Sequence, residues 1–230
     1  LEHKAQAAAE FSGVTAFTPI ADGNEVVLGM REGFAIIVAS DGRDAPLARL
    51  DFPGDTAVSI AAPSAGSIFI SLGSGRTLHW HVAKGETKAH VLDLGSPMSR
   101  AQLLADSSRV AILTYDGDLF LWSPGQTERR IRAMQNVTEF ATHPTDANQL
   151  VVSRFALSTF AVDVGLLDLR ARRFDAKFRM DENFVSSLQF VSDGSAVLAL
   201  SADGGLTRYE IATARQTKFA NSARVIQVGP

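Results

Sequence analysis

The sequence predicts an all-β fold in which a unit of four short strands is repeated along the chain. Five segments share one pattern, in which a turn of small residues leads into a short apolar strand that ends on a bulky residue. These end positions are Val38, Trp80, Trp122, Leu169 and Tyr209. They lie 42, 42, 47 and 40 residues apart, and a period near 40 built from short strands is typical of propeller blades. No window shows a sustained helical period, apart from one short stretch at Glu2–Phe11.

The 230 residues divide into five predicted repeats with a short segment at each end. Residues 1–12 form an N-terminal segment, and residues 223–230 start a sixth repeat or form a closing strand. The repeats are expected at about 13–54, 55–96, 97–135, 136–182 and 183–222. We therefore predict a β-propeller with about five complete four-stranded blades and the first strand of a sixth.

Each repeat is expected to contribute four strands. In repeat one they are Val14–Ile20, Glu25–Met30, Phe34–Ala39 and Leu47–Phe52. In repeat two they are Ala57–Ala62, Ser67–Leu72, Leu78–Ala83 and Ala89–Leu94. In repeat three they are Arg100–Leu104, Val110–Thr114, Leu119–Ser123 and Arg129–Ala133. In repeat four they are Thr138–Thr142, Gln149–Phe155, Leu166–Arg170 and Phe174–Arg179, and in repeat five Ser186–Val191, Ala196–Ser201, Leu206–Ile211 and Thr217–Ala220.

Turn chemistry and strand composition support this division. An acidic residue followed by glycine supplies the positive φ that tight hairpins need. Such pairs occur at Asp22-Gly23, Glu32-Gly33, Asp41-Gly42, Asp116-Gly117, Asp193-Gly194 and Asp203-Gly204. The second strand of each repeat is the most apolar, which indicates burial on both faces between neighbouring blades.

Repeat four carries an insertion, Ala156–Asp163, between its second and third strands. The insertion is too apolar for a solvated loop. It is either an extended hairpin whose longer strands pack on each other or part of a contact surface, with Leu157 and Phe160 as candidate binding residues. Insertions in repeat arrays often collect on the binding face.

The last residues, Ala223–Val228, look like a first strand with nothing after it. A propeller closes its ring to protect the blade edges. The missing strands could come from further sequence, from the N-terminal segment or from a second chain. We expect further sequence or another chain to complete the ring.

Composition narrows the function classes. The net charge is −3, which argues against a dedicated nucleic-acid binder. The absence of cysteine excludes disulfides and thiol chemistry and is consistent with a cytoplasmic protein. No apolar run is long enough for a membrane span. Abundant alanine and a preference for arginine over lysine point to a bacterial source.

The third strands resemble WD40-type repeats, most clearly at Asp116–Trp122 and Asp203–Tyr209. The turns at Thr18–Gly23, Thr142–Pro144 and Val191–Gly194 also match that family's habit. The Trp-Asp and Gly-His dipeptides of the family are missing, since Ser123 follows Trp122 and His81 follows Trp80. The resemblance is to a degenerate WD40-like propeller, and it implies a rigid platform for binding proteins.

Three groups of side chains are candidate sites. His79 and His81 share a strand face but lack a third metal ligand, so we expect no metal site and no cofactor. Among the aspartates at turns, Asp116 and Asp118 most resemble the ligands of a calcium-binding loop. We interpret these aspartates as turn-forming residues, because aspartate tolerates turn backbone. Two basic stretches, one repeat apart, could form an anion-facing rim. They contain Arg129, Arg130, Arg132, Arg170, Arg172 and Arg173.

The sequence is interpreted as a non-catalytic protein-interaction or sensing module within a larger bacterial protein. Trp80, Trp122, Tyr209, Asp116, Gly117, Asp203 and Gly204 are expected to be structural. The alternatives are a propeller enzyme with a central substrate site, or an accessory propeller of a protease or NTPase. The first strand of each repeat should line the propeller axis. The polar residues expected there are Thr15, Ser59, Gln102, Glu139, Gln189 and Gln227. Only Glu139 is ionised, which argues against catalysis at a central site.

Overall fold

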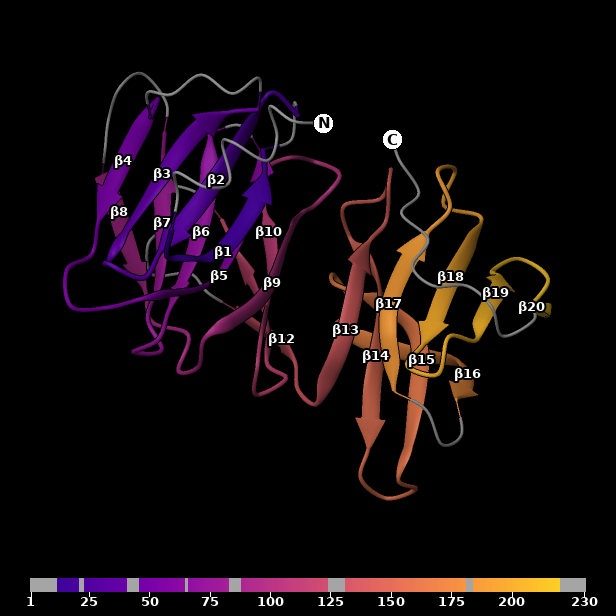
Figure 1. Cartoon of the computed structure of the whole chain (residues 1–230). Helices are drawn as coiled ribbons and strands as arrows, with labels where there is room; N and C mark the ends of the chain where they lie inside the picture. The colour runs from indigo at the N-terminus through magenta and orange to yellow at the C-terminus, as the bar shows by residue number, and fades with distance from the viewer. Residues whose placement is uncertain are drawn as a thin grey trace. The chain divides into compact units, whose positions relative to one another are not determined.

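The computed structural model contains five four-stranded antiparallel sheets, each a simple meander of consecutive strands (Figure 1). The structure describes residues 12–20, 23–40, 46–64, 66–82, 88–123, 131–180 and 184–219. Within these ranges every regular element is a strand, as the all-β prediction requires. In the same ranges there is no helix long and apolar enough to cross a membrane.

The sheets follow one another along the chain. Sheet one holds β1 (Val14–Pro19), β2 (Glu25–Met30), β3 (Phe34–Ala39) and β4 (Ala48–Asp51). Sheet two holds β5 (Ala57–Ser64), β6 (Ser67–Leu72), β7 (Thr77–His81) and β8 (Lys88–Leu92). Sheet three holds β9 (Met98–Leu103), β10 (Val110–Thr114), β11 (Leu119–Trp122) and β12 (Ile131–Met134).

Sheet four holds β13 (Val137–Thr142), β14 (Gln149–Ala156), β15 (Ala161–Asp168) and β16 (Arg173–Met180). Sheet five holds β17 (Val185–Phe190), β18 (Ala196–Ser201), β19 (Leu206–Glu210) and β20 (Gln216–Phe219). The chain forms two compact units, Leu1–Ala101 and Gln102–Pro230, whose boundary falls within β9.

Glycines at the predicted turns close the hairpins by a shared geometry. Gly23, Gly33, Gly117, Gly194 and Gly204 all have φ between 73° and 88°. Each donates its N–H to the carbonyl three residues earlier, as Gly117 does to Thr114 at 3.0 Å. This left-handed backbone is the reason glycine follows the acidic residue in these pairs.

Strand register defines equivalent positions in the five sheets. Val38 pairs with Val26, Trp80 with Ile68, Trp122 with Val110 and Tyr209 with Val197. In sheet four the equivalent pair is Leu167 with Leu150, so the sequence-based choice of Leu169 was two residues too late. The corrected spacings are 42, 42, 45 and 42 residues. The longer hairpin of sheet four adds five residues between the paired positions, and the stretch before it is two residues shorter.

Each unit has its own apolar core between neighbouring sheets. In the first unit Val27, Ile37 and Leu50 of sheet one pack with Ile68 and Trp80 of sheet two. In the second unit one cluster joins sheets three and four, and another joins sheets four and five. Hence the back faces of sheets two, four and five, which carry the Trp80-type position, pack on the preceding sheet, and the front faces of sheets one, three and four are covered by the next sheet.

The insertion in repeat four is an extended hairpin. β14 and β15 are each eight residues long. They pair without interruption, from the pair of Gln149 with Asp168 to the pair of Ala156 with Ala161. Four residues, 157–160, form the turn. Lengthened strands and an exposed turn are therefore both present, and the third strand begins five residues earlier than Leu166.

Several sequence-based expectations fall outside the described residues. These are most of the N-terminal segment, the turn residues Asp22, Asp41 and Gly42, the arginines Arg129 and Arg130, and the closing strand Ala223–Val228.

Candidate functional site

Exposed apolar side chains gather on one rim of the second unit. We call Tyr115, Phe155, Leu157, Phe160 and Phe184 the rim patch. Phe160 is 80% exposed and Phe184 60%, while Tyr115 and Leu157 are similarly exposed and Phe155 is half-buried. A cluster of large apolar side chains that are exposed to solvent to this extent is typical of contact surfaces.

The aromatic rings of the patch are in contact with one another. The ring of Phe155 lies 6.3 Å from that of Phe160 in an edge-on arrangement, and 6.3 Å from that of Phe184 in a stacked one. Phe155 belongs to β14, Phe160 ends the β14–β15 turn, and Phe184 precedes β17. The patch therefore joins sheets four and five.

Backbone contacts extend the same rim to sheet three. Val137 N donates to the carbonyl of Gly117 in the β10–β11 turn at 2.9 Å, and Phe155 N donates to Asn136 O at 2.9 Å. The turn that carries Tyr115 thus adjoins the start of sheet four, which in turn adjoins Phe155.

The turn residue Phe160 has an unusual backbone. Its φ is +51°, in the left-handed region, which is costly for a bulky residue and which glycine or asparagine enters more readily. An exposed phenylalanine therefore occupies a position where local stability favours glycine. Strain kept together with an exposed aromatic ring indicates a role for the ring outside the fold.

A partly buried carboxylate binds two arginines on sheet four. Asp163 on β15 is 3.0 Å from Arg179 Nε and 3.7 Å from Arg154 Nη2. The Arg154 guanidinium lies 4.6 Å above the Phe174 ring. Arg154, Asp163 and Arg179 share one face of sheet four, whereas Phe155, which pairs with Val162, points to the opposite face, toward sheet five.

The two predicted basic stretches lie on different sheets. Arg132 on β12 is held 3.3 Å from Asp118 and lies over Phe120 within its own sheet. Arg170, Arg172 and Arg173 are exposed at the β15–β16 turn. Asp168 fixes this turn by accepting hydrogen bonds from the backbone N–H groups of residues 170 and 171, both at 2.8 Å. An anion-facing rim built from both stretches remains a prediction.

His79 of sheet two has contacts within its own sheet. His79 is 4% exposed, stacks on Phe69 with ring centroids 4.9 Å apart, and places Nε2 3.1 Å from Ser67 Oγ. Burial, with smaller effects of His81 and His90, lowers the pKa of His79 to about 4. Among the described residues no group of three or more acidic or histidine side chains could hold a metal ion.

Other singled-out polar residues have local structural partners. His143 Nδ1 accepts the backbone N–H groups of Thr145 and Asp146 at 3.2 and 3.0 Å, as expected of turn chemistry. Gln102 Oε1 accepts from Thr142 N at 3.0 Å. Glu139 Oε1 accepts from the backbone of Phe140 at 2.8 Å.

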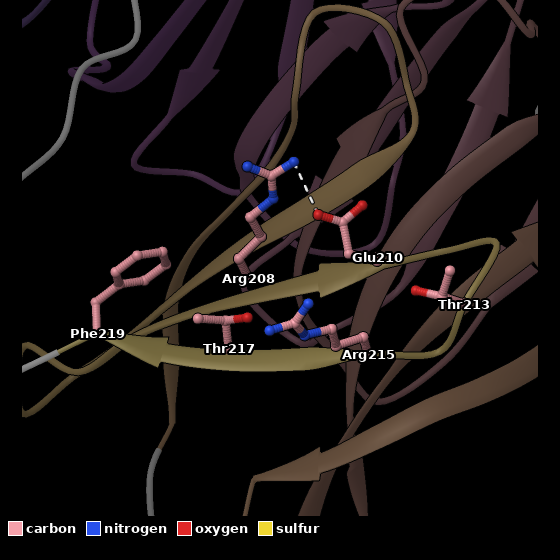
Figure 2. Close-up of a pocket in the computed structure, with 6 residues that line it drawn as sticks. All are labelled: Arg208, Glu210, Thr213, Arg215, Thr217 and Phe219. Atoms are coloured by element: carbon pink, nitrogen blue, oxygen red, sulfur yellow. Dashed lines mark ion pairs between the residues drawn. The ribbon is translucent and has the colours of Figure 1, made fainter.

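A second candidate surface is a pocket of about 420 Å³ on the β19–β20 hairpin (Figure 2). It is lined by Arg208, Glu210, Thr213, Arg215, Thr217 and Phe219. Register pairs Leu206 with Phe219 and Arg208 with Thr217, so these side chains share the front face of sheet five. Arg208 Nη2 is 2.9 Å from Glu210 Oε1.

Sequence reasoning found Leu157 and Phe160 through the apolar insertion, but it missed the other members of both surfaces. Tyr115 and Phe184 border turns, where an aromatic residue carries a weak signal of exposure. Arg208 alternates with the buried residues Thr207 and Tyr209, and that pattern alone does not distinguish a covered sheet face from an open one.

Comparison with known proteins identifies the fold. No model of a protein family matches the sequence, and no curated protein matches it. The structure is similar to the β-propeller domain of Cps50 (Swd1) from Myceliophteria thermophila, with a TM-score of 0.66 at 11% sequence identity. The match covers 87% of this chain and 67% of that domain. The fold is therefore a β-propeller, as the period of the sequence predicted.

Proposed function

We propose that this chain is a non-catalytic protein-interaction module of degenerate WD40-like repeats, and that the rim patch is its principal contact with a partner protein. The observation that carries the proposal is the exposed, mutually contacting cluster around Phe160. Aromatic residues dominate the energy of protein interfaces because they bury a large area at low entropic cost.

The patch has the composition expected at the centre of such an interface. Leu157 and Phe160 lie on the turn of a hairpin longer than those of the other sheets. Phe155 on β14 contacts both Phe160 and Phe184, the residue before β17. A partner with an exposed apolar side chain would complement this surface.

The partner can be identified by cross-linking from position 160. A photoreactive phenylalanine analogue is placed there in the full chain, and the same analogue at Val91, an exposed residue of sheet two, serves as the control. We expect one dominant cross-linked protein from position 160 and none in common from position 91. Equal labelling from both positions would show that the patch has no dedicated partner.

Binding of the purified partner then separates function from stability. Phe160→Gly relieves the positive φ, so the free energy of unfolding should stay constant or rise by up to about 1 kcal/mol. The same variant should weaken binding by at least about tenfold, since it removes a central aromatic group. Unchanged affinity in Phe160→Gly and Leu157→Ser would refute the proposed surface.

We also infer that the repeat array belongs to a larger bacterial, cytoplasmic protein and is completed by further sequence or by another chain. The partial coverage of the similar propeller domain supports the completion of the array, because one third of that domain has no counterpart among these residues. The five expected repeats, at about 13–54, 55–96, 97–135, 136–182 and 183–222, then form part of the completed ring.

A further inference from the structure

The front face of sheet five keeps the features of a covered face. Leu206 and Phe219 are a cross-strand pair on β19 and β20, equivalent to Val164 and Phe178 in sheet four. Phe178 is 7% exposed because Tyr209 of the next sheet stacks on it, with ring centroids 5.2 Å apart. Phe219 is 45% exposed. An aromatic platform is thus present at the position where the preceding sheet receives an aromatic ring.

The same face differs from the others in one row. The residue immediately before the Trp80-type position is apolar or uncharged in the first four sheets, but it is Arg208 in sheet five. The four counterparts are Ile37, His79, Leu121 and Leu166. Arg208 stands between Leu198 on β18 and Thr217 on β20, and the next row along the strands contains Glu210 and Arg215.

The charged row is incompletely paired. The Nη2 group of Arg208 forms an ion pair with Glu210, but the buried Nε of Arg208 has no hydrogen-bond partner. Within the described part of the chain Arg215 makes no ion pair, and Asp193 at the β17–β18 turn interacts with Arg208 more weakly. The residues lining the pocket carry two guanidinium groups and one carboxylate. A carboxylate entering from outside would complete these hydrogen bonds.

We propose that the front face of sheet five binds an extended polypeptide segment that carries an aromatic residue and, two residues away on the same face, a glutamate or aspartate. The aromatic ring stacks on Phe219, and the carboxylate accepts hydrogen bonds from Arg208 and Arg215. Two-residue spacing matches the rows of the sheet, because alternate residues of a strand share a face. The inference rests on the part of the proposed function in which further polypeptide completes the array, and it names the chemistry of that polypeptide.

The test uses the intact chain and short synthetic peptides. The matching probe is acetyl-Trp-Thr-Glu-Thr-amide, which places the ring and the carboxylate on one side of a strand. One control peptide replaces Glu by Gln, and another, acetyl-Thr-Trp-Glu-Thr-amide, places ring and carboxylate on opposite sides. Binding is followed by shifts of backbone amide signals on titration.

We expect the matching peptide to bind with a dissociation constant of about 1 mM and to shift signals on β18, β19 and β20. Both control peptides should bind about tenfold more weakly, and Arg215→Gln should cause a similar loss. Arg172→Gln, which removes an exposed arginine from the β15–β16 turn, should leave the affinity unchanged. Phe219→Ser should weaken all three peptides.

Three results would overturn the inference: no shifts with the matching peptide, equal binding of the Glu and Gln peptides, or equal losses in Arg215→Gln and Arg172→Gln. The Phe160→Gly variant separates this surface from the rim patch. It should bind the matching peptide like the unaltered chain, so failure at sheet five leaves the rim-patch proposal standing, and loss of partner binding at the rim leaves sheet five untouched.

Discussion

Protonation of His79 should make the protein less stable in mild acid. Its ring is buried against Phe69, and its pKa is lowered from 6.5 to about 4, first by burial and then by His81 and His90. The folded chain therefore binds fewer protons than the unfolded chain between these two pH values. Stability is fully present above pH 6.5, falls as the pH drops through 6.5, and levels off below about 4.

The size of the effect follows from the two pKa values. Their difference corresponds to about 3 kcal/mol below pH 4, and about 2 kcal/mol of it would be lost between pH 7 and pH 5. His81 and His90 are exposed, so water screens their share of the repulsion. We therefore expect a loss of about 1–2 kcal/mol over that interval from His79.

Urea unfolding at pH 7 and pH 5 measures this loss directly. His79→Gln keeps a polar group near Ser67 but cannot titrate. The free energy of unfolding of this variant should therefore fall by about 1–2 kcal/mol less, between pH 7 and pH 5, than that of the unaltered chain. His81→Gln alters an exposed neighbour and should retain nearly the full pH dependence. If His79→Gln and the unaltered chain show the same pH dependence within about 0.5 kcal/mol, the argument from burial is wrong.

Two further predictions concern packing. Trp122 is 3% exposed, so Trp122→Ala should lower the free energy of unfolding by about 3–5 kcal/mol, measured by urea titration, and a cost near zero would contradict the register assigned to β11. Gly165 faces the bulge in β16, where an added Cβ would lie 2.3 Å from Asp175 O, so Gly165→Ala should lower the melting temperature by several degrees. Gly66→Ala is the matched control, because its nearest neighbour would be His81 at 3.7 Å, and similar losses in both variants would exclude the steric explanation.

Local sequence determined the strands and turns of this protein. Acidic residues followed by glycine end the hairpins at Gly33, Gly117 and Gly204 because the left-handed backbone there is a property of a few adjacent residues. Apolar second strands such as Val110–Thr114 were predicted to the residue, since burial on both faces leaves a continuous apolar run. The period near 40 then indicated the propeller, which the structural similarity confirms.

Register in repeat four needed the structure. The apolar residues Leu167 and Leu169 both fit the sequence pattern, and both are buried. Only the pairing of β14 with β15 shows that Leu167 is the counterpart of Trp80, because strand pairing joins residues that are far apart in the chain.

The candidate surfaces also depended on tertiary structure. Phe178 and Phe219 occupy the same position in two repeats, yet one is covered by Tyr209 and the other lies in a pocket. Phe155, Phe160 and Phe184 form one patch because a hairpin turn and the start of the next sheet meet in space. Alternation along a strand determines which residues share a face, whereas exposure of that face depends on what packs against it, and that is decided only when distant segments come together.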